Sequence, residues 1–157
     1  MSMRILGIDP GTGIMGFGVI EVNPRGVRMI DAGVITTPPH TPHAERLEDI
    51  FNSLSVIVKE TKPEACSIEK LFFSRNITTA MTVAEARGVA LLVASQHGLK
   101  IAEYTPPQIK QTLTGYGKAD KKQVQEMVRL HLGLKDLPKP DDAADALAAA
   151  ITHSLMV

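Results

Sequence analysis

Three apolar segments follow one another at the start of the chain, and only short turns separate them. They cover residues 3–9, 15–22 and 26–37, and the turn sequence Asn-Pro-Arg-Gly joins the second segment to the third. Val and Ile recur in these segments, which is typical of β-strands, and connections this short join strands that lie side by side. The sequence therefore predicts a three-stranded meander, which commits the fold to a sheet.

The rest of the chain alternates helical and strand patterns. After the break Pro-Pro-His-Thr-Pro-His, apolar residues at helical spacing predict an amphipathic helix that ends at Lys62. Strands are predicted over residues 64–69 and 99–104, with a helix over 76–98 between them. Because a long crossover containing a helix joins parallel strands, the first and fourth strands can lie side by side in parallel. The predicted fold is α/β, with a five-stranded mixed sheet flanked by helices.

The helix predicted over residues 76–98 is apolar nearly all round and has Asn76 as its cap. A helix without a polar face should be buried against more than one neighbour. A further helix is predicted over about residues 119–132, where Asp120 and Gln123 have the spacing of a capping box, and a last helix ends the chain.

Overall charge gives no indication of a nucleic-acid partner, because the 157 residues include 17 basic and 17 acidic side chains. The distribution is uneven, since residues 107–139 hold seven Lys or Arg against three acids and leave the remainder net acidic. No repeat, linker or low-complexity segment divides the chain. We therefore expect one domain that spans residues 1–157.

The single cysteine, Cys66, lies in an apolar run and is expected to be a buried thiol, because one cysteine cannot form a disulfide within a monomer. The N-terminus lacks the apolar core of a signal peptide, and no run approaches the ~18 apolar residues of a membrane span. These features lead us to expect a soluble, cytoplasmic protein that has no membrane partner.

Acidic residues stand at the ends of two predicted strands. Asp9 ends the first strand and Glu69 ends the fourth. If these strands are parallel neighbours, both carboxylates emerge at the carboxyl edge of the sheet, where open α/β sheets place their sites. Taken singly, each acid has an ordinary explanation, Asp9 as a turn former before Pro-Gly and Glu69 as an edge residue.

The last predicted helix begins with the sequence Pro-Asp-Asp-Ala-Ala-Asp-Ala-Leu, in which Asp142 and Asp145 share one face. An acid at a helix start is ordinarily a cap, but one cap is enough for a helix. Four acids from three remote segments would repel one another unless a cation is present. Oxygen ligands without His or Cys select Mg²⁺ or Mn²⁺, and sites that hold two such ions perform phosphoryl transfer on nucleic acids.

The sequence resembles the RuvC family of bacterial Holliday junction resolvases, which have a ribonuclease H-like fold. The resemblance runs over almost the whole chain and rests on the following segments: ILGIDPGTGIMGFGVIE, IEKLFF, ARGVAL, IKQTLTG, QVQEMVR and DDAADALAAAITH. It implies an endodeoxyribonuclease that resolves four-way junctions in recombination and DNA repair. Such an enzyme acts as a homodimer that nicks two opposed strands, uses two Mg²⁺ ions during catalysis with Mn²⁺ as a substitute, and works with the RuvA-RuvB helicase complex.

The resemblance also assigns roles to residues. The catalytic acids and metal ligands it implies are Asp9, Glu69, Asp142 and Asp145. In that case Asp141 becomes the helix cap. Two lysines, Lys110 and Lys121, match family positions near the scissile phosphate, and the resemblance implies that they are catalytic. Without the resemblance they would be interpreted as part of a solvated basic face.

The same resemblance assigns contacts with DNA. Phe72 matches an aromatic residue that the family uses against unpaired bases, although a phenylalanine three residues past a strand is ordinarily part of the core. The other implied DNA contacts are Arg75, Asn76, Lys110, Lys118, Lys121 and Lys122.

Three alternatives compete with this interpretation. Residues 7–18 also resemble the first phosphate loop of the actin, sugar kinase and heat-shock chaperone superfamily, but those ATPases clamp the nucleotide between two such domains. A junction-binding module that has lost catalysis would lack at least one of the four acids, and all four are present. Short RNA-processing relatives share the Gly-Ile-Asp start but not the matches to ARGVAL and DDAADALAAAITH.

Overall fold

The computed structural model of the protein describes residues 1–70 and 77–157, without the side chains of residues 77 and 78. Three predicted DNA contacts, Phe72, Arg75 and Asn76, therefore lie outside the described residues. A five-stranded mixed sheet has the order β3-β2-β1-β4-β5. Its strands are β1 (Met3–Asp9), β2 (Ile14–Asn23), β3 (Gly26–Thr36), β4 (Ala65–Glu69) and β5 (Lys100–Tyr104). The predicted mixed sheet is confirmed, because β1, β2 and β3 pair antiparallel, whereas β1 pairs parallel with β4 and β4 with β5.

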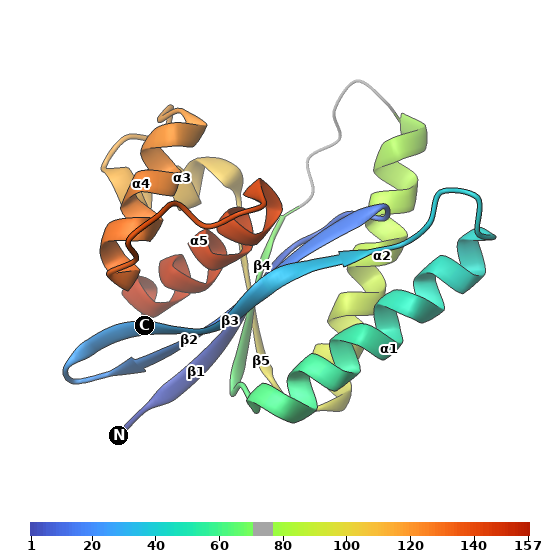
Figure 1. Ribbon diagram of the computed structural model, residues 1–157, viewed down its shortest axis with the longest axis horizontal. Coiled ribbons are helices and arrows are strands. Elements are labelled where there is room, and N and C mark those ends of the chain that lie inside the picture. The colour runs from blue at the N-terminus through green and yellow to red at the C-terminus, as the bar shows by residue number, and fades with distance from the viewer. Residues whose placement is uncertain (71–76) are drawn as a thin grey trace.

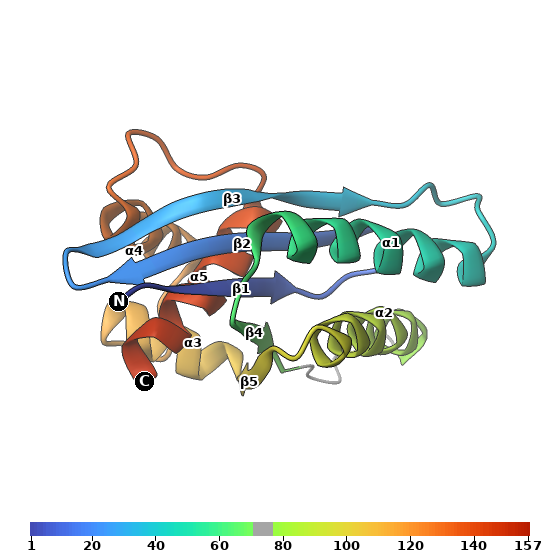
Figure 2. The same ribbon diagram turned by 90° about the horizontal axis from the view of Figure 1, so that it is seen from below.

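Helices cover both faces of this sheet. They are α1 (His43–Thr61), α2 (Ile77–Gln96), α3 (Pro106–Thr114), α4 (Lys121–Leu132) and α5 (Asp141–Met156). Figures 1 and 2 show α1 and α2 on one face and α3, α4 and α5 on the other. None of the helices in the described part of the chain is both long and apolar enough to cross a membrane.

Local sequence sets the ends of these helices. Asp120 and Gln123 form the predicted capping box at the start of α4. The start of α3 has a second capping box, in which Thr105 and Gln108 flank two prolines. Helix α1 ends where Lys62 takes a left-handed conformation with φ 51°.

The sheet has one apolar core on each face, and strand alternation decides which residues join which core. In β1, Leu6 and Ile8 belong to the core under α1 and α2, whereas Ile5 packs with α3, α4 and α5. Cys66 in β4 is fully buried, as predicted. The alternation continues to the strand end, so that Asp9 has the same orientation as Ile5 and points to the face covered by α5.

Two glycines let α5 lie directly on the backbone of the sheet. A Cβ atom at Gly7 would overlap the carbonyl oxygen of Ala146, and one at Gly16 would overlap the carbonyl oxygen of Asp142. Glycine is therefore required where the first turns of α5 cross β1 and β2. This close approach determines how near the acids of α5 come to the end of β1.

Helix α2 is less enclosed than its composition predicts. Ala86, Ala90 and Val93 are buried in the core shared with α1. The opposite side is exposed, with Met81 59% and Leu92 50% accessible. Helix α2 packs against more than one neighbour, α1 and β5, as predicted, but one side of it stays exposed within a single chain.

Candidate active site

The parallel pairing of β1 with β4 brings the first two acids to the same edge of the sheet. Ile8 pairs with Ile68, so that Asp9 and Glu69 occupy the next position in each strand. Both face α5, because the alternate position Ser67 already does, with its Oγ donating a 2.6 Å hydrogen bond to the carbonyl of Ala149. The arrangement expected from the sequence is thus present in the fold.

Helix α5 adds the second pair of acids from above the sheet. Asp9, Asp142 and Asp145 each offer a carboxylate oxygen, and these oxygens all lie within 4.8 Å of one another. All three residues are partly exposed, so that solvent and ligands can reach them. A half-buried group of three carboxylates is a chemically suitable donor set for a hard divalent cation.

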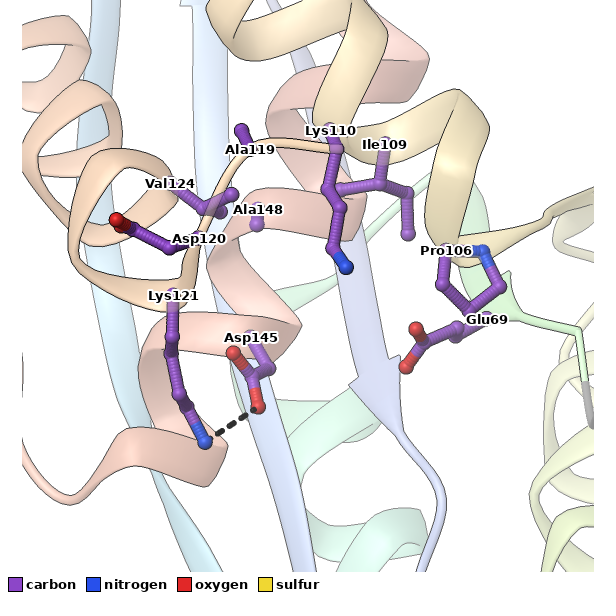
Figure 3. A pocket seen from close by; sticks show the side chains of 10 residues that line it. All are labelled: Glu69, Pro106, Ile109, Lys110, Ala119, Asp120, Lys121, Val124, Asp145 and Ala148. Atoms are coloured by element: carbon purple, nitrogen blue, oxygen red, sulfur yellow. Dashed lines mark ion pairs between the residues drawn. The ribbon is translucent and has the colours of Figure 1, made fainter. Parts of the chain in front are cut away.

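Glu69 lies at the side of this group of three acids. It lines a cavity of about 300 Å³ together with Asp145 and two lysines, Lys110 and Lys121. Figure 3 shows the Glu69 carboxylate and the Lys110 amine pointing toward the middle of this cavity, with Asp145 across from them. The four predicted acids therefore converge, with oxygens of three of them within 4.8 Å of one another and Glu69 facing Asp145 across the cavity.

Burial and mutual repulsion raise the pKa values of these acids. Burial, followed by the charges of Asp145 and Glu69, raises the pKa of Asp9 to about 8. Burial and the Asp145 charge also raise the pKa of Glu69, although Lys110 and Lys121 partly offset the shift. The fold thus places side by side carboxylates whose negative charges repel one another. A bound cation would offset this repulsion.

Lys121 forms ion pairs at the rim of the cavity. Its Nζ lies 3.7 Å from an Asp145 oxygen and 3.5 Å from an Asp141 oxygen. The Asp145 charge is the main reason that the pKa of Lys121 is raised. Lys121 is therefore a cation held next to the acids.

The other predicted lysines are placed differently from one another. Lys110 is partly buried in α3 and lines the cavity. Lys118 and Lys122 are exposed. Lys122 borders a separate depression with Gln123 and Glu126, so that it lies outside the acidic cavity.

Asp141 does not cap α5, which corrects the sequence-based assignment. Pro140 occupies the N-cap position, and no side chain caps the helix. The Asp141 carboxylate instead accepts a 3.1 Å hydrogen bond from Gln125 Nε2 and pairs with Lys121. Gln125 is only 8% exposed, and sequence analysis missed its role because a glutamine within an amphipathic helix gives no signal of a buried partner.

The site and the fold agree on one class of protein. A mixed sheet in the order β3-β2-β1-β4-β5, with acids at the ends of β1 and β4 and at the start of the last helix, is the arrangement of ribonuclease H-like nucleases. The family model described as "Crossover junction endodeoxyribonuclease RuvC" matches residues 5–153. This chain belongs to the RuvC family.

Relatives and solved structures agree with this assignment. The RuvC of Chloroflexus aurantiacus is 54% identical over 97% of this chain and 93% of its own length, and that of Desulfitobacterium hafniense is 53% identical over 97% and 92%. The structure of Thermus thermophilus RuvC with a Holliday junction substrate superposes with a TM-score of 0.93 at 39% identity, over 98% of this chain and 94% of that one. The yeast mitochondrial resolvase Ydc2 shares the fold, with a TM-score of 0.70 at 14% identity over 98% of this chain and 78% of its own.

Proposed function

We propose that this protein is a divalent-metal-dependent endonuclease that resolves Holliday junctions in recombination and repair. The observation that carries the proposal is the convergence of Asp9, Asp142 and Asp145 within 4.8 Å, with Glu69 facing them, in a chain of the RuvC family. The single-domain organisation of residues 1–157 and a cytoplasmic location are part of the same proposal.

The four acids would hold the metal ions. Mg²⁺, or Mn²⁺ in its place, would be bound as a pair during catalysis and would supply activation of water and stabilisation of the leaving oxygen. Asp9 and Asp142 provide oxygens from the sheet and from α5, Asp145 faces both the group of acids and the cavity, and Glu69 closes the opposite side.

The lysines around the cavity act on the DNA phosphate. Lys110 and Lys121 lie where negative charge would develop on a phosphate held above the acids, and a lysine serves there as a point charge. Lys118 and Lys122 are exposed farther out and contribute to backbone binding. Phe72, Arg75 and Asn76, which follow Glu69 in the sequence and lie outside the described residues, complete the proposed DNA contacts.

A second copy of the chain would cover the exposed face of α2. Met81, Gly88 and Leu92 fall on one side of this helix, where apolar surface is open in a single chain. An isologous contact between two such faces buries them and gives two active sites for the two opposed strands of a junction. The RuvA-RuvB helicase complex is the partner that would present the junction to this homodimer.

Substrate preference tests this proposal directly. A four-way junction, a linear duplex of the same sequence and a structured RNA should be incubated with the protein and Mg²⁺, and the products mapped on each strand. We expect paired nicks at symmetric positions of the junction and slow or undetectable cleavage of the other two. Equal cleavage of the linear duplex, or preferred cleavage of the RNA, would contradict it.

A further inference from the structure

Arg87 joins helix α2 to the end of the strand that carries Glu69. Its Nε donates a 3.1 Å hydrogen bond to the backbone carbonyl of Glu69. Its Nη2 lies 3.3 Å from Glu103 Oε1 on the neighbouring strand β5. The Arg87 side chain is 14% exposed, whereas that of Glu103 is 39% exposed, so that the guanidinium is largely buried and its ion-pair partner is open to water. One guanidinium therefore bridges α2 and the ends of two strands.

The hydrogen bond from Arg87 to Glu69 lies at the carboxyl end of β4. Glu69 is the last residue of β4, and Lys70 adds one more hydrogen bond, from its N–H to the carbonyl of Tyr104 at 2.7 Å. The guanidinium of Arg87 binds the carbonyl of the same peptide, so that both polar groups of this peptide have a partner. A charge-assisted hydrogen bond from a rigid, planar donor restricts both the position and the tilt of that peptide.

The orientation of this peptide affects the position of the Glu69 carboxylate, because the side chain extends from this point of the backbone into the acidic cavity (Figure 3). Carboxylates that share metal ions need placement to within a fraction of an ångström, and misplacement of about 1 Å can cost roughly 100-fold in rate. Of the four acids, Glu69 is the one that stands apart from the group within 4.8 Å. Its position therefore depends on what holds the end of β4.

We propose that Arg87 is a positioning residue for Glu69, and that it ties the direction of this carboxylate to helix α2. The inference rests on the proposed function, since it concerns the efficiency of the same site. Arg87 does not touch the reacting atoms. It acts through the backbone of Glu69, and the helix that carries it is also the one whose opposite side would meet the second copy.

Three variants separate this role from simple structural support. Arg87→Met keeps the apolar stem and loses both polar contacts. Arg87→Lys keeps the positive charge, but a lysine cannot span both acceptors with the same fixed geometry. Glu103→Gln removes only the ion pair with β5 and leaves the contact with Glu69, so that it is the matched control.

Junction cleavage should be measured at saturating substrate, together with the junction Kd and with Mn²⁺ binding by calorimetry in the absence of DNA. For Arg87→Met we expect kcat to fall about 10- to 100-fold, with the Kd for the junction within about two-fold and with weaker Mn²⁺ binding. Arg87→Lys should recover part of kcat, and Glu103→Gln should stay close to the unaltered protein.

Two results would overturn the inference. If Arg87→Met melts at a lower temperature but keeps its kcat per folded molecule and its Mn²⁺ affinity, Arg87 only supports the fold. If Glu103→Gln lowers kcat as far as Arg87→Met does, the ion pair and not the Glu69 contact is responsible. If the unaltered protein does not cleave junctions, the proposed function fails, and Mn²⁺ binding by the same variants still tests the role of Arg87.

Discussion

Asp9 carries a carboxyl group that this fold keeps largely protonated near neutral pH. Burial is the main cause, and the neighbouring charges of Asp145 and Glu69 add to it, so that its pKa rises from 3.8 to about 8. The folded state therefore binds a proton that the unfolded state has released. Stability from this group is fully present below about pH 4 and is lost as pH rises through about 8.

This linkage predicts how the metal-free protein melts. Between about pH 5 and pH 8 its Tm should fall, by about 2–4 °C for each kcal/mol of stability lost. Mg²⁺ should raise the Tm more at pH 8 than at pH 5.5, because cation binding requires the ionised acids. Asp9→Asn should flatten the pH dependence in thermal melts. A Tm of the chelated protein that rises steadily over this range would contradict the assigned shift.

Lys121 differs from its neighbour Lys122 in what it touches, although both are exposed. Lys121 pairs with Asp145 and Asp141, whereas Lys122 lies outside the acidic cavity. Lys121→Ala should lower kcat by about 10-fold or more and change junction affinity little. Lys122→Ala should change mainly the affinity and its salt dependence. If Lys121→Ala weakens binding in step with turnover, this lysine tethers phosphate and has no catalytic role.

At the scale of elements, the seating of α5 on β1 and β2 determines the geometry of the site. Gly16 lies directly under the carbonyl of Asp142, and any side chain there must push the start of α5 away from the sheet. Gly16→Ala should therefore lower the free energy of unfolding by about 1–3 kcal/mol and reduce cleavage by more than the lost stability explains.

Gly117→Ala is the matched control for that change. A Cβ at Gly117 would meet its nearest neighbour, Gln111 Oε1, at 3.6 Å, which is an ordinary contact. Thermal melts and kcat should both stay near those of the unaltered protein. Equal loss in the two variants would mean that loss of glycine in general, and not the approach of α5, explains the effect.

Most of the element order could be predicted from the sequence, because strand and helix periods are local. The expected parallel pairing of β1 with β4 also placed Asp9 and Glu69 at the same edge of the sheet. The start of α3 was missed, although Thr105 and Gln108 have the spacing of a capping box.

Other features depend on contacts that a sequence does not display. The roles of Asp141 and Gln125 arise only when α4 and α5 lie side by side, which a helix-capping rule cannot anticipate. Arg87 binds the backbone carbonyl of Glu69, and because every residue has such a carbonyl, the sequence does not show which one an arginine will bind. The packing of α2 against two neighbours could be predicted from its composition, but which of its sides stays exposed could not, because that depends on where α1 and β5 lie.

At the scale of the whole molecule, the exposed side of α2 is the surface proposed for the second copy. Leu92 is 50% exposed there, and Val56 on α1 is 52% exposed and provides a matched control. Leu92→Glu should give folded monomers that bind junctions weakly and fail to make paired nicks, because a buried charge disrupts an isologous contact. Val56→Glu should remain a dimer. Sedimentation and strand-resolved cleavage check both, and paired cleavage by a Leu92→Glu monomer would contradict the dimer.

Four converging carboxylates form the proposed metal-dependent nuclease site. The most direct measurement is cleavage of a four-way junction, alongside junction binding, by four charge-removing variants: Asp9→Asn, Glu69→Gln, Asp142→Asn and Asp145→Asn. The exposed Asp136→Asn serves as the control. We predict that each of the four loses cleavage and keeps junction binding, that Asp136→Asn keeps both, and that excess chelator stops the unaltered protein. Cleavage in excess chelator, or near-normal cleavage by any two of the four variants, would contradict the account.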